Sequence, residues 1–223
     1  MYAIIIPVDI SFFIANLIKI PAGGWVVVLI AIAVYLTMAT WIRGRAILHK
    51  NVEAVELNMN LFIDDVRLTK PHRVPGVAVF LSSSISGVSR GLLHNFKHNK
   101  ILHEKTVILS VLIEDVPKIA SGERLSHKSL GEGFHQIVLR YGFSESANVP
   151  AALATLSIPG LVFDMMQTTY FLGKESLVIA STPTMALWRK KIFHSMAHNS
   201  LNASSFFALP PNRVVELGVQ VEL

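Results

Sequence analysis

The chain has 223 residues, of which 52% are hydrophobic, with a mean hydropathy of +0.49 and a formal net charge of +5. This mean hydropathy is too high for an ordinary soluble domain, and residues 1–41 carry only Asp9 and Lys19 as formal charges. Cysteine is absent, which excludes disulfides, cysteine nucleophiles and cysteine metal ligands and fits a cytosolic domain. We attribute the basic excess to a positive-inside bias and to anionic lipid headgroups in preference to nucleic acid.

Two apolar segments near the N-terminus predict a transmembrane helical hairpin. Residues 2–17 form the shorter segment, and residues 18–24, with one proline and two glycines, form a hairpin-like connection. Residues 25–41 are uncharged and cover roughly 26 Å as a helix, near the lower limit for crossing a bilayer. A signal peptide is the alternative, but no basic region precedes the first apolar segment and Asp9 interrupts it.

The charges that flank the second segment predict its orientation. Arg43, Arg45, His49 and Lys50 follow it within a few residues, and short flanks rich in lysine and arginine stay in the cytoplasm. The remainder of the chain is therefore expected in the cytoplasm, on the inner face of the plasma membrane. Asp9 is an acidic group at membrane depth, for which a transport-related role and a capping or interfacial role both remain open.

Residues 46–70 predict one amphipathic helix that connects the membrane to the next domain. Apolar side chains recur there at alternating spacings of four and three, which places them on one stripe of a helix. The stripe consists of Leu48, Val52, Val55, Met59, Phe62 and Val66. We expect it to pack against protein, because so few heptads are weak evidence for a coiled coil.

Residues 71–223 predict a mixed-sheet α/β domain, because segments typical of strands and helices alternate there. The expected strands are 77–81, 106–113, 123–130, 134–142, 166–172, 176–180 and 213–221, and the expected helices are 89–98, 149–156 and 185–199. Residues 106–113 are apolar on both faces and predict the central strand. The predicted organisation is thus a membrane helix pair (1–45), a connecting helix (46–70) and a cytosolic domain (71–223).

A basic motif and an acidic pair are the candidate site residues of this domain. The motif HNFKHNK (94–100) contains His94, Lys97, His98 and Lys100. It follows a turn rich in serine and glycine, and its imidazole and ammonium groups supply donors and positive charge for phosphate. Glu114–Asp115 ends the predicted central strand, where α/β sheets place ligand crevices.

We predict that the basic motif and the acidic pair border one crevice for an anionic regulatory ligand, a nucleotide. The alternatives are a solvated helix end or a metal-binding histidine pair for the basic motif, and a turn cap for the acidic pair. We predict no resident metal ion. Enzyme activity and a cofactor are not expected either, because the sequence contains no Ser-His-Asp order, no Walker motif and no GxGxxG.

The C-terminal region of the Kup/HAK/KT family of potassium uptake permeases resembles this chain along its whole length. The matching segments are PVDISFFIANLIKIPAGGWVVVLIAIAVYLTMATWIRGR (7–45), RVPGVAVFLSS (73–83), LLHNFKHNKILHEKTVILSV (92–111), Glu114–Asp115, RYGFSE (140–145), YFLGKESL (170–177) and LPPNRVVELGVQVEL (209–223). The resemblance implies a parent protein with about twelve membrane helices, which imports potassium ions together with protons around a midplane site.

The resemblance also implies that this chain is the C-terminal piece of such a permease, with Met1 inside the penultimate membrane helix. Asp9 matches an acidic position of that helix, and no potassium ligand is carried over, because the family's ion-binding residues lie in earlier helices. We therefore expect the C-terminal portion of a potassium transporter that does not transport alone. A membrane-anchored ligand-sensing domain is the alternative function, and a homodimer is an open alternative for assembly.

Overall fold

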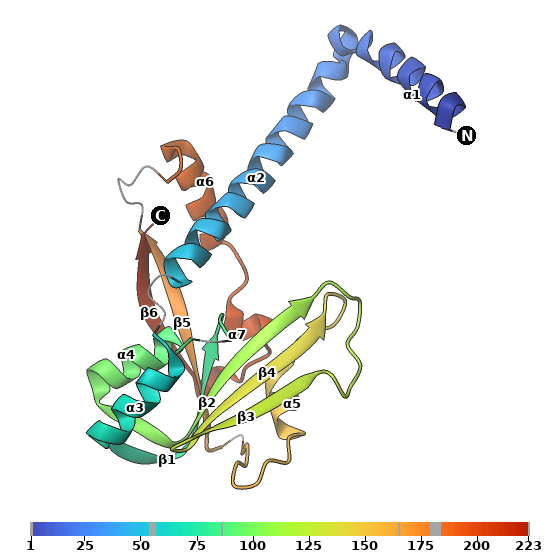
Figure 1. Cartoon of the computed structure of the whole chain (residues 1–223). Helices are drawn as coiled ribbons and strands as arrows, with labels where there is room; N and C mark the ends of the chain where they lie inside the picture. The colour runs from blue at the N-terminus through green and yellow to red at the C-terminus, as the bar shows by residue number, and fades with distance from the viewer. Residues whose placement is uncertain (1, 54–56, 86, 165, 179–183, 223) are drawn as a thin grey trace.

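The computed structural model describes residues 2–53, 57–85, 87–164, 166–178 and 184–222. Its helices are α1 (Tyr2–Leu17), α2 (Trp25–Glu53), α3 (Met59–Thr69), α4 (Arg90–Asn99), α5 (Val149–Ala154), α6 (Leu187–His198) and α7 (Ala203–Phe206), with the short helices η1 (Ile20–Gly24) and η2 (Pro211–Arg213). Its strands are β1 (His72–Ser82), β2 (Ile101–Glu114), β3 (Leu125–Gly131), β4 (Phe134–Gly142), β5 (Thr168–Val178) and β6 (Val214–Glu222). Figure 1 shows α2 rising from one end of an α/β domain and α1 turning away at its tip.

Helix α2 is the membrane-spanning candidate. Within the described residues, one stretch, Ile20–Asn51, is long and apolar enough to cross a bilayer, whereas the apolar stretch Ile5–Leu17 of α1 is shorter. Gly23 between them adopts φ 127°, a left-handed angle that favours glycine, and this kink changes the direction of the chain. Figure 1 shows that the two helices diverge from this kink, and the transmembrane helical hairpin stays a prediction.

The prediction of a single connecting helix over residues 46–70 was wrong. Helix α2 continues past the membrane segment to Glu53, and α3 is a separate helix that begins at Met59. Asn58 starts α3 because its backbone is extended and its side chain accepts a hydrogen bond of 2.9 Å from the amide of Asn60. The expected stripe is divided accordingly: Leu48 packs against α6 and the stripe residues of α3 pack on the sheet, while Val55 lies outside the described residues.

The domain is built on one six-stranded sheet with the order β3-β4-β2-β1-β5-β6. Only β3 is antiparallel to its neighbour, so the sheet is mixed, and β2 lies between β1 and β4 as the predicted central strand should. The predicted hairpin of β3 and β4 is confirmed, with a turn around Glu132. Strand β1 begins earlier than predicted, and a register shift between Val74 and Val77 accommodates Pro75 and Gly76.

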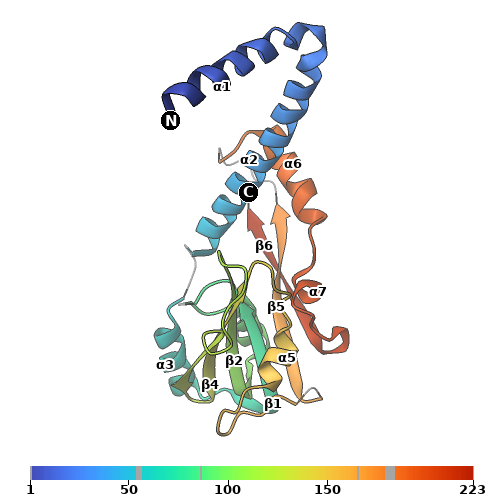
Figure 2. The ribbon, with the colours of Figure 1, turned by 90° about the vertical axis from the view of Figure 1, so that its right-hand side faces the viewer.

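The two strands predicted at 166–172 and 176–180 are the single strand β5. Beyond Phe171 this strand loses β1 as a partner, but its ladder with β6 continues from Tyr170–Val214 to Val178–Glu222. Residues 172–178 and 216–222 therefore form a two-stranded arm that extends from the sheet toward α2 (Figure 2). The predicted interruption at Gly173 is bridged because the parallel partner supplies the hydrogen bonds.

Consecutive strand residues point to opposite faces and fill two separate cores. One face packs against α5 and its flanking segments through Val79, Val107, Leu109, Ile137, Leu139, Val149 and Leu153. The other face packs against α3 and α4 through Phe62, Val66, Ala78, Phe80, Leu92, Ile108 and Phe134. Helices on both faces leave the carboxyl ends of the parallel strands as the place where a ligand has access.

Candidate functional site: a crevice beneath the membrane helix

The connections of the sheet create a crevice at the carboxyl ends of β1 and β5. From β1 the chain passes through α4 to β2 on one side, whereas β5 lies on the other side of β1 and is reached through α5. Open α/β sheets bind ligands at such a switch point, because the two connections diverge there. A cavity of about 460 Å³ lies at this position. Its lining includes Arg45, His49, Ser82, Ser83, Ser89, Arg90, Gly91, Leu172, Gly173 and Phe207.

Basic side chains from two different elements meet at this crevice. Arg45 and His49 come from the C-terminal part of α2, and Arg90 is the first residue of α4. The guanidinium of Arg90 donates a hydrogen bond of 3.1 Å to the backbone carbonyl of Asn51, which ties α4 to the end of α2. The N-terminus of α4 adds the positive end of its dipole, so the crevice suits an anionic group.

The turn between β1 and α4 is held by serine hydroxyls. The buried Ser89 hydroxyl donates to the carbonyl of Leu81 at 2.9 Å, and the Ser110 hydroxyl donates to the carbonyl of Ser84 at 2.8 Å. The side-chain amide of Gln136 also donates to the carbonyl of Ile85. Ser86, part of the predicted serine cluster, lies outside the described residues. These bonds connect the turn to β1, β2 and β4, and so they fix one wall of the crevice.

The structure separates the candidate residues that we expected to share a crevice, so that prediction was wrong. His94, Lys97 and His98 lie in the C-terminal half of α4, and Lys100 follows it immediately before β2. Glu114 ends β2, whose 14 residues span roughly 43 Å at about 3.3 Å per residue. A helix that connects two parallel strands runs back along them, so its C-terminus lies at the opposite edge from the strand ends.

Three residues of the expected site, His94, His98 and Glu114, have neighbours close by. The rings of His94 and His98 lie 5.7 Å apart, and the described residues contain no group of three metal-capable side chains. The carboxylate of Glu114 pairs with Arg140 at 3.4 Å, and Asp115 follows it in the chain. The crevice is lined instead by Arg90 together with Arg45 and His49, which the sequence analysis had used only to predict the orientation of the membrane segment. The serine-rich turn before the helix was the feature that pointed to this place.

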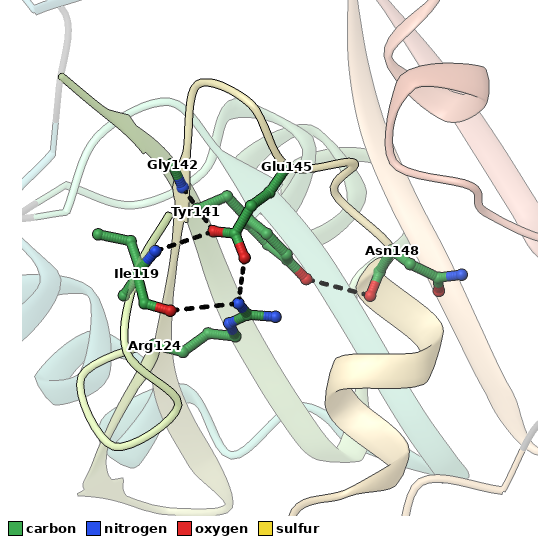
Figure 3. A network of polar contacts seen from close by, with 6 residues as sticks. All are labelled: Ile119, Arg124, Tyr141, Gly142, Glu145 and Asn148. Atoms are coloured by element: carbon green, nitrogen blue, oxygen red, sulfur yellow. Dashed lines mark hydrogen bonds and ion pairs between the residues drawn. The ribbon is translucent and has the colours of Figure 1, made fainter. Parts of the chain in front are cut away.

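A second polar network lies at the carboxyl end of β4 (Figure 3). The carboxylate of Glu145 accepts hydrogen bonds from the amides of Gly142 at 2.8 Å and Ile119 at 3.1 Å, and it pairs with Arg124. These donors, with the two amides first and Arg124 after them, lower the pKa of Glu145. The stabilisation is complete above the ordinary glutamate pKa of about 4.3 and is lost as pH falls through the lowered value.

Tyr141 belongs to the same network. Its hydroxyl donates to the carbonyl of Asn148 at 3.1 Å, while the guanidinium of Arg124 lies 5.3 Å from the centre of its ring. Burial raises the pKa of the Tyr141 hydroxyl, against an opposing effect of Arg124. None of these residues lines the crevice, so we interpret the network as structural: it holds the loop after β4 against the segment before β3.

The contact between α2 and α6 links the membrane helix to the domain. Gly44 lies directly against Phe193, since a Cβ at this position would lie 2.2 Å from the phenyl ring. Trp41 packs on the same ring at 5.4 Å between centroids. The Nε of Arg189 donates a hydrogen bond of 3.0 Å to the hydroxyl of Thr40, which is fully buried. The arm adds Leu177 and Val221 to this cluster, so α2 is held between α6 and the arm.

Two family models match the chain in succession. Residues 1–46 match the K+ potassium transporter integral membrane domain, and residues 75–223 match the K+ potassium transporter C-terminal domain. The interval between the two matches, residues 47–74, contains the end of α2, α3 and the start of β1.

Relatives match along nearly the whole chain. A probable potassium transport system protein Kup 1 of Novosphingobium aromaticivorans is 44% identical over 223 residues, which is 100% of this chain and 34% of that protein. A Kup 1 of Geobacter sulfurreducens is 43% identical over 99% of this chain and 35% of the relative, and a Kup of Anaeromyxobacter dehalogenans is 45% identical over 97% and 33%. No solved structure matches. The chain spans about a third of the length of these relatives, and it belongs to the K+ potassium transporter family, whose C-terminal domain it contains.

Proposed function

We propose that this chain is the C-terminal portion of a proton-coupled potassium uptake transporter in the plasma membrane, with its α/β domain in the cytoplasm. The observation that carries the proposal is the match to both the membrane and the C-terminal domain of potassium transporters, in order, over residues 1–46 and 75–223. The basic residues that follow the membrane segment, among them Arg43 and Lys50, support the cytoplasmic side for the domain.

The chain by itself lacks the means to enclose an ion. Helices α1 and α2 diverge (Figure 1), and in the described part of the chain their large apolar side chains are exposed along the membrane segment, so these two helices enclose no site together. A potassium ion that crosses a bilayer needs oxygen ligands in a site shielded by several helices. Potassium ions and protons would therefore cross through further membrane helices, and Asp9 of α1 would contribute to coupling or to helix packing beside them.

We further propose that the domain stabilises and regulates transport through α2. The crevice lies between α4 and the cytosolic end of α2, and Arg45 and Arg90 reach it from these two elements. An anionic ligand that binds both side chains would hold α2 in one position relative to the domain. Its chemical class is a nucleotide, because a crevice of about 460 Å³ with an apolar sheet wall admits a base beside phosphates.

The same crevice supports the second candidate function, a membrane-anchored ligand-sensing domain. In that case α1 and α2 serve as an anchor alone, and ligand binding has no effect on ion flux. The two candidates are distinguished by transport in the presence of the membrane helices that relatives carry upstream.

Complementation of a cell that lacks potassium uptake tests the transport proposal. The chain is expressed alone and as a chimera, behind the upstream two thirds of the Novosphingobium aromaticivorans relative. We expect growth at low potassium and rubidium uptake from the chimera only. A chimera in which Asp9→Asn abolishes uptake without loss of protein supports a coupling role. An inactive chimera that is well inserted in the membrane contradicts the transporter assignment.

Calorimetry tests the ligand. The detergent-solubilised chain is titrated with a panel of nucleotides, and Arg90→Ala is compared with Lys97→Ala, which lies at the other end of α4. Loss of one charged contact to phosphate costs about 1.5–3 kcal/mol, so we expect Arg90→Ala to weaken binding by roughly ten- to a hundredfold and Lys97→Ala to leave it unchanged. Equal affinities for both variants, or no heat from any nucleotide, remove the nucleotide proposal.

A further inference from the structure

We propose that α6 is an interfacial helix whose first two turns insert into the cytoplasmic headgroup region of an anionic bilayer. The proposal rests on the membrane crossing of α2 proposed above, and it assigns a lipid surface as the partner of Leu187, Trp188 and Lys191. Neither the family match nor the crevice accounts for these side chains. Three features of the described structure support the proposal: the depth of α6, the division of its exposed face, and its charge.

The depth of α6 follows from its contacts with α2. Arg189 binds Thr40 and Phe193 packs on Gly44, so the two helices run in the same direction, side by side (Figures 1 and 2). Thr40 belongs to the uncharged membrane segment, three residues before Arg43. Leu187 and Trp188 precede Arg189 and therefore lie farther toward the membrane than Thr40. The start of α6 is thus at the depth at which α2 enters the bilayer.

The exposed face of α6 carries large apolar side chains around Lys191 at this end and polar side chains at the other. Leu187 is 66% exposed, Trp188 50% and Ile192 38%, whereas Ser195 and His198 occupy the same face farther from the membrane. Full exposure of large apolar side chains to water is unfavourable, and tryptophan is enriched where hydrocarbon meets headgroups. The change from apolar to polar along one helix face matches the change from acyl chain to water across the interface.

The charges at this level select an anionic lipid surface. The sequence of α6, LWRKKIFHSMAH, contains no acidic residue, and Lys191 is exposed beside Trp188 on the same face. The exposed Arg43 of α2 adds a further positive charge near this depth. Each lysine or arginine near an anionic leaflet gains about a fivefold preference for it. The positive charge on this face complements an anionic bilayer better than a neutral protein surface, so we propose the bilayer as the partner.

Single nitroxide labels measure the depth directly, because the chain has no cysteine. Leu187→Cys is labelled in the full chain, reconstituted in vesicles of phosphatidylcholine with phosphatidylglycerol. Ser195→Cys, on the same face of α6, is the matched control, and Ile30→Cys in α2 is the reference for membrane depth. The readout is the accessibility of each label to oxygen, which concentrates in lipid, relative to a water-soluble nickel complex.

We expect the oxygen-to-nickel ratio to decrease from residue 30 to 187 to 195, with residue 187 several-fold above residue 195. Lys191→Gln should reduce the ratio at residue 187 in anionic vesicles and leave it unchanged in pure phosphatidylcholine, whereas Lys128→Gln, on the sheet edge opposite β6, should have no effect in either. Equal ratios at 187 and 195 overturn the inference while the reference at residue 30 still supports the membrane crossing. A label at 187 that is shielded from both reagents also overturns it, since that result indicates protein packing. Water exposure at residue 30 contradicts both proposals.

Discussion

Gly142 is a position at which the backbone leaves no room for a side chain. A Cβ there would lie 2.3 Å from the carbonyl oxygen of Pro117. We expect Gly142→Ala to lower the free energy of unfolding by about 1–3 kcal/mol, because the loop after β4 must move and carry Glu145 away from its amide donors. Chemical denaturation of the full chain in detergent measures the effect.

The control for Gly142→Ala is Gly173→Ala. Gly173 lies in β5, and a Cβ at this position meets no atom within 4 Å. Alanine removes backbone freedom from the unfolded chain there and adds no clash, so we expect a change of less than about 1 kcal/mol. Equal free energies of unfolding for the two variants would show that the close approach of Pro117 to Gly142 does not affect stability.

His135 makes the stability of the domain depend on pH. Its Nδ1 lies 3.1 Å from the Nε2 of His127, and burial lowers the pKa of His135, with further lowering by the charges of His127 and Lys105. The unfolded chain binds the proton at about pH 6.5, above the folded state. The contribution of His135 to the free energy of unfolding is therefore constant above this pH and decreases as pH falls from about 6.5 through the lowered pKa.

We expect His135→Gln to flatten this decrease, as measured by thermal unfolding at a series of pH values between neutral and mildly acidic. Part of the slope will remain, since burial also lowers the pKa of His103. A variant with the full slope of the original chain would show that the proton is bound elsewhere.

At the scale of elements, the local pattern predicted most strands and helices, but of the strand pairs it predicted only the hairpin. The apolar runs located β2 in the centre of the sheet and the hairpin of β3 and β4, because burial on both faces and a glycine-flanked turn are local properties. The division of β5 at Gly173 was wrong, because the parallel ladder to β6 joins residues more than 40 positions apart. The break at Asn58 was missed because the apolar stripe continues across it, although each half of the stripe faces a different core.

The sequence predicted one part of the crevice and missed another. The serine-rich turn was identified, and the positive end of α4 follows from a strand-helix-strand unit with parallel strands. We chose the charged C-terminal end of the helix instead, because its lysines and histidines are close together in the chain. The contribution of α2 was hidden for a different reason: Arg45 and His49 approach Arg90 only through tertiary packing, and their charge also has a topological explanation.

The junction of α2 and α6 yields a prediction about how firmly the domain is attached. We expect Gly44→Ala to separate the two helices, because the added methyl group would lie 2.2 Å from the ring of Phe193. Nitroxide labels at Lys50→Cys and Ser195→Cys, both exposed positions, measure the distance between α2 and α6 by pulsed electron paramagnetic resonance. The distance distribution should be narrow in the original chain and broad in the variant.

Gly218→Ala provides the comparison for the helix junction, since a Cβ at Gly218 in β6 meets no atom within 4 Å. Its distance distribution should equal that of the original chain. If Gly44→Ala leaves the distribution narrow as well, the contact of Gly44 with Phe193 is not what aligns the two helices.

For the whole molecule, three connections converge on the C-terminal part of α2. Arg90 holds Asn51 from α4, Phe193 packs on Gly44 from α6, and the arm of β5 and β6 contributes Val221. A domain joined to its membrane helix at one point only would move independently of it. Contacts on several sides hold α2 to the domain, and the regulatory role that we propose depends on this attachment.

The orientation of the molecule is the last prediction. The flank of α2 with Arg43 and Arg45 predicts that Ala22 faces the outside and Gln220 faces the cytoplasm. Both positions are exposed in the described structure, so single cysteines there are accessible to a reagent that does not cross membranes. In intact cells we expect Ala22→Cys to be labelled and Gln220→Cys to react only after permeabilisation. The reverse pattern would place the α/β domain outside, where neither a cytosolic nucleotide nor the anionic inner leaflet is present, and it would remove the regulatory proposal together with the topology.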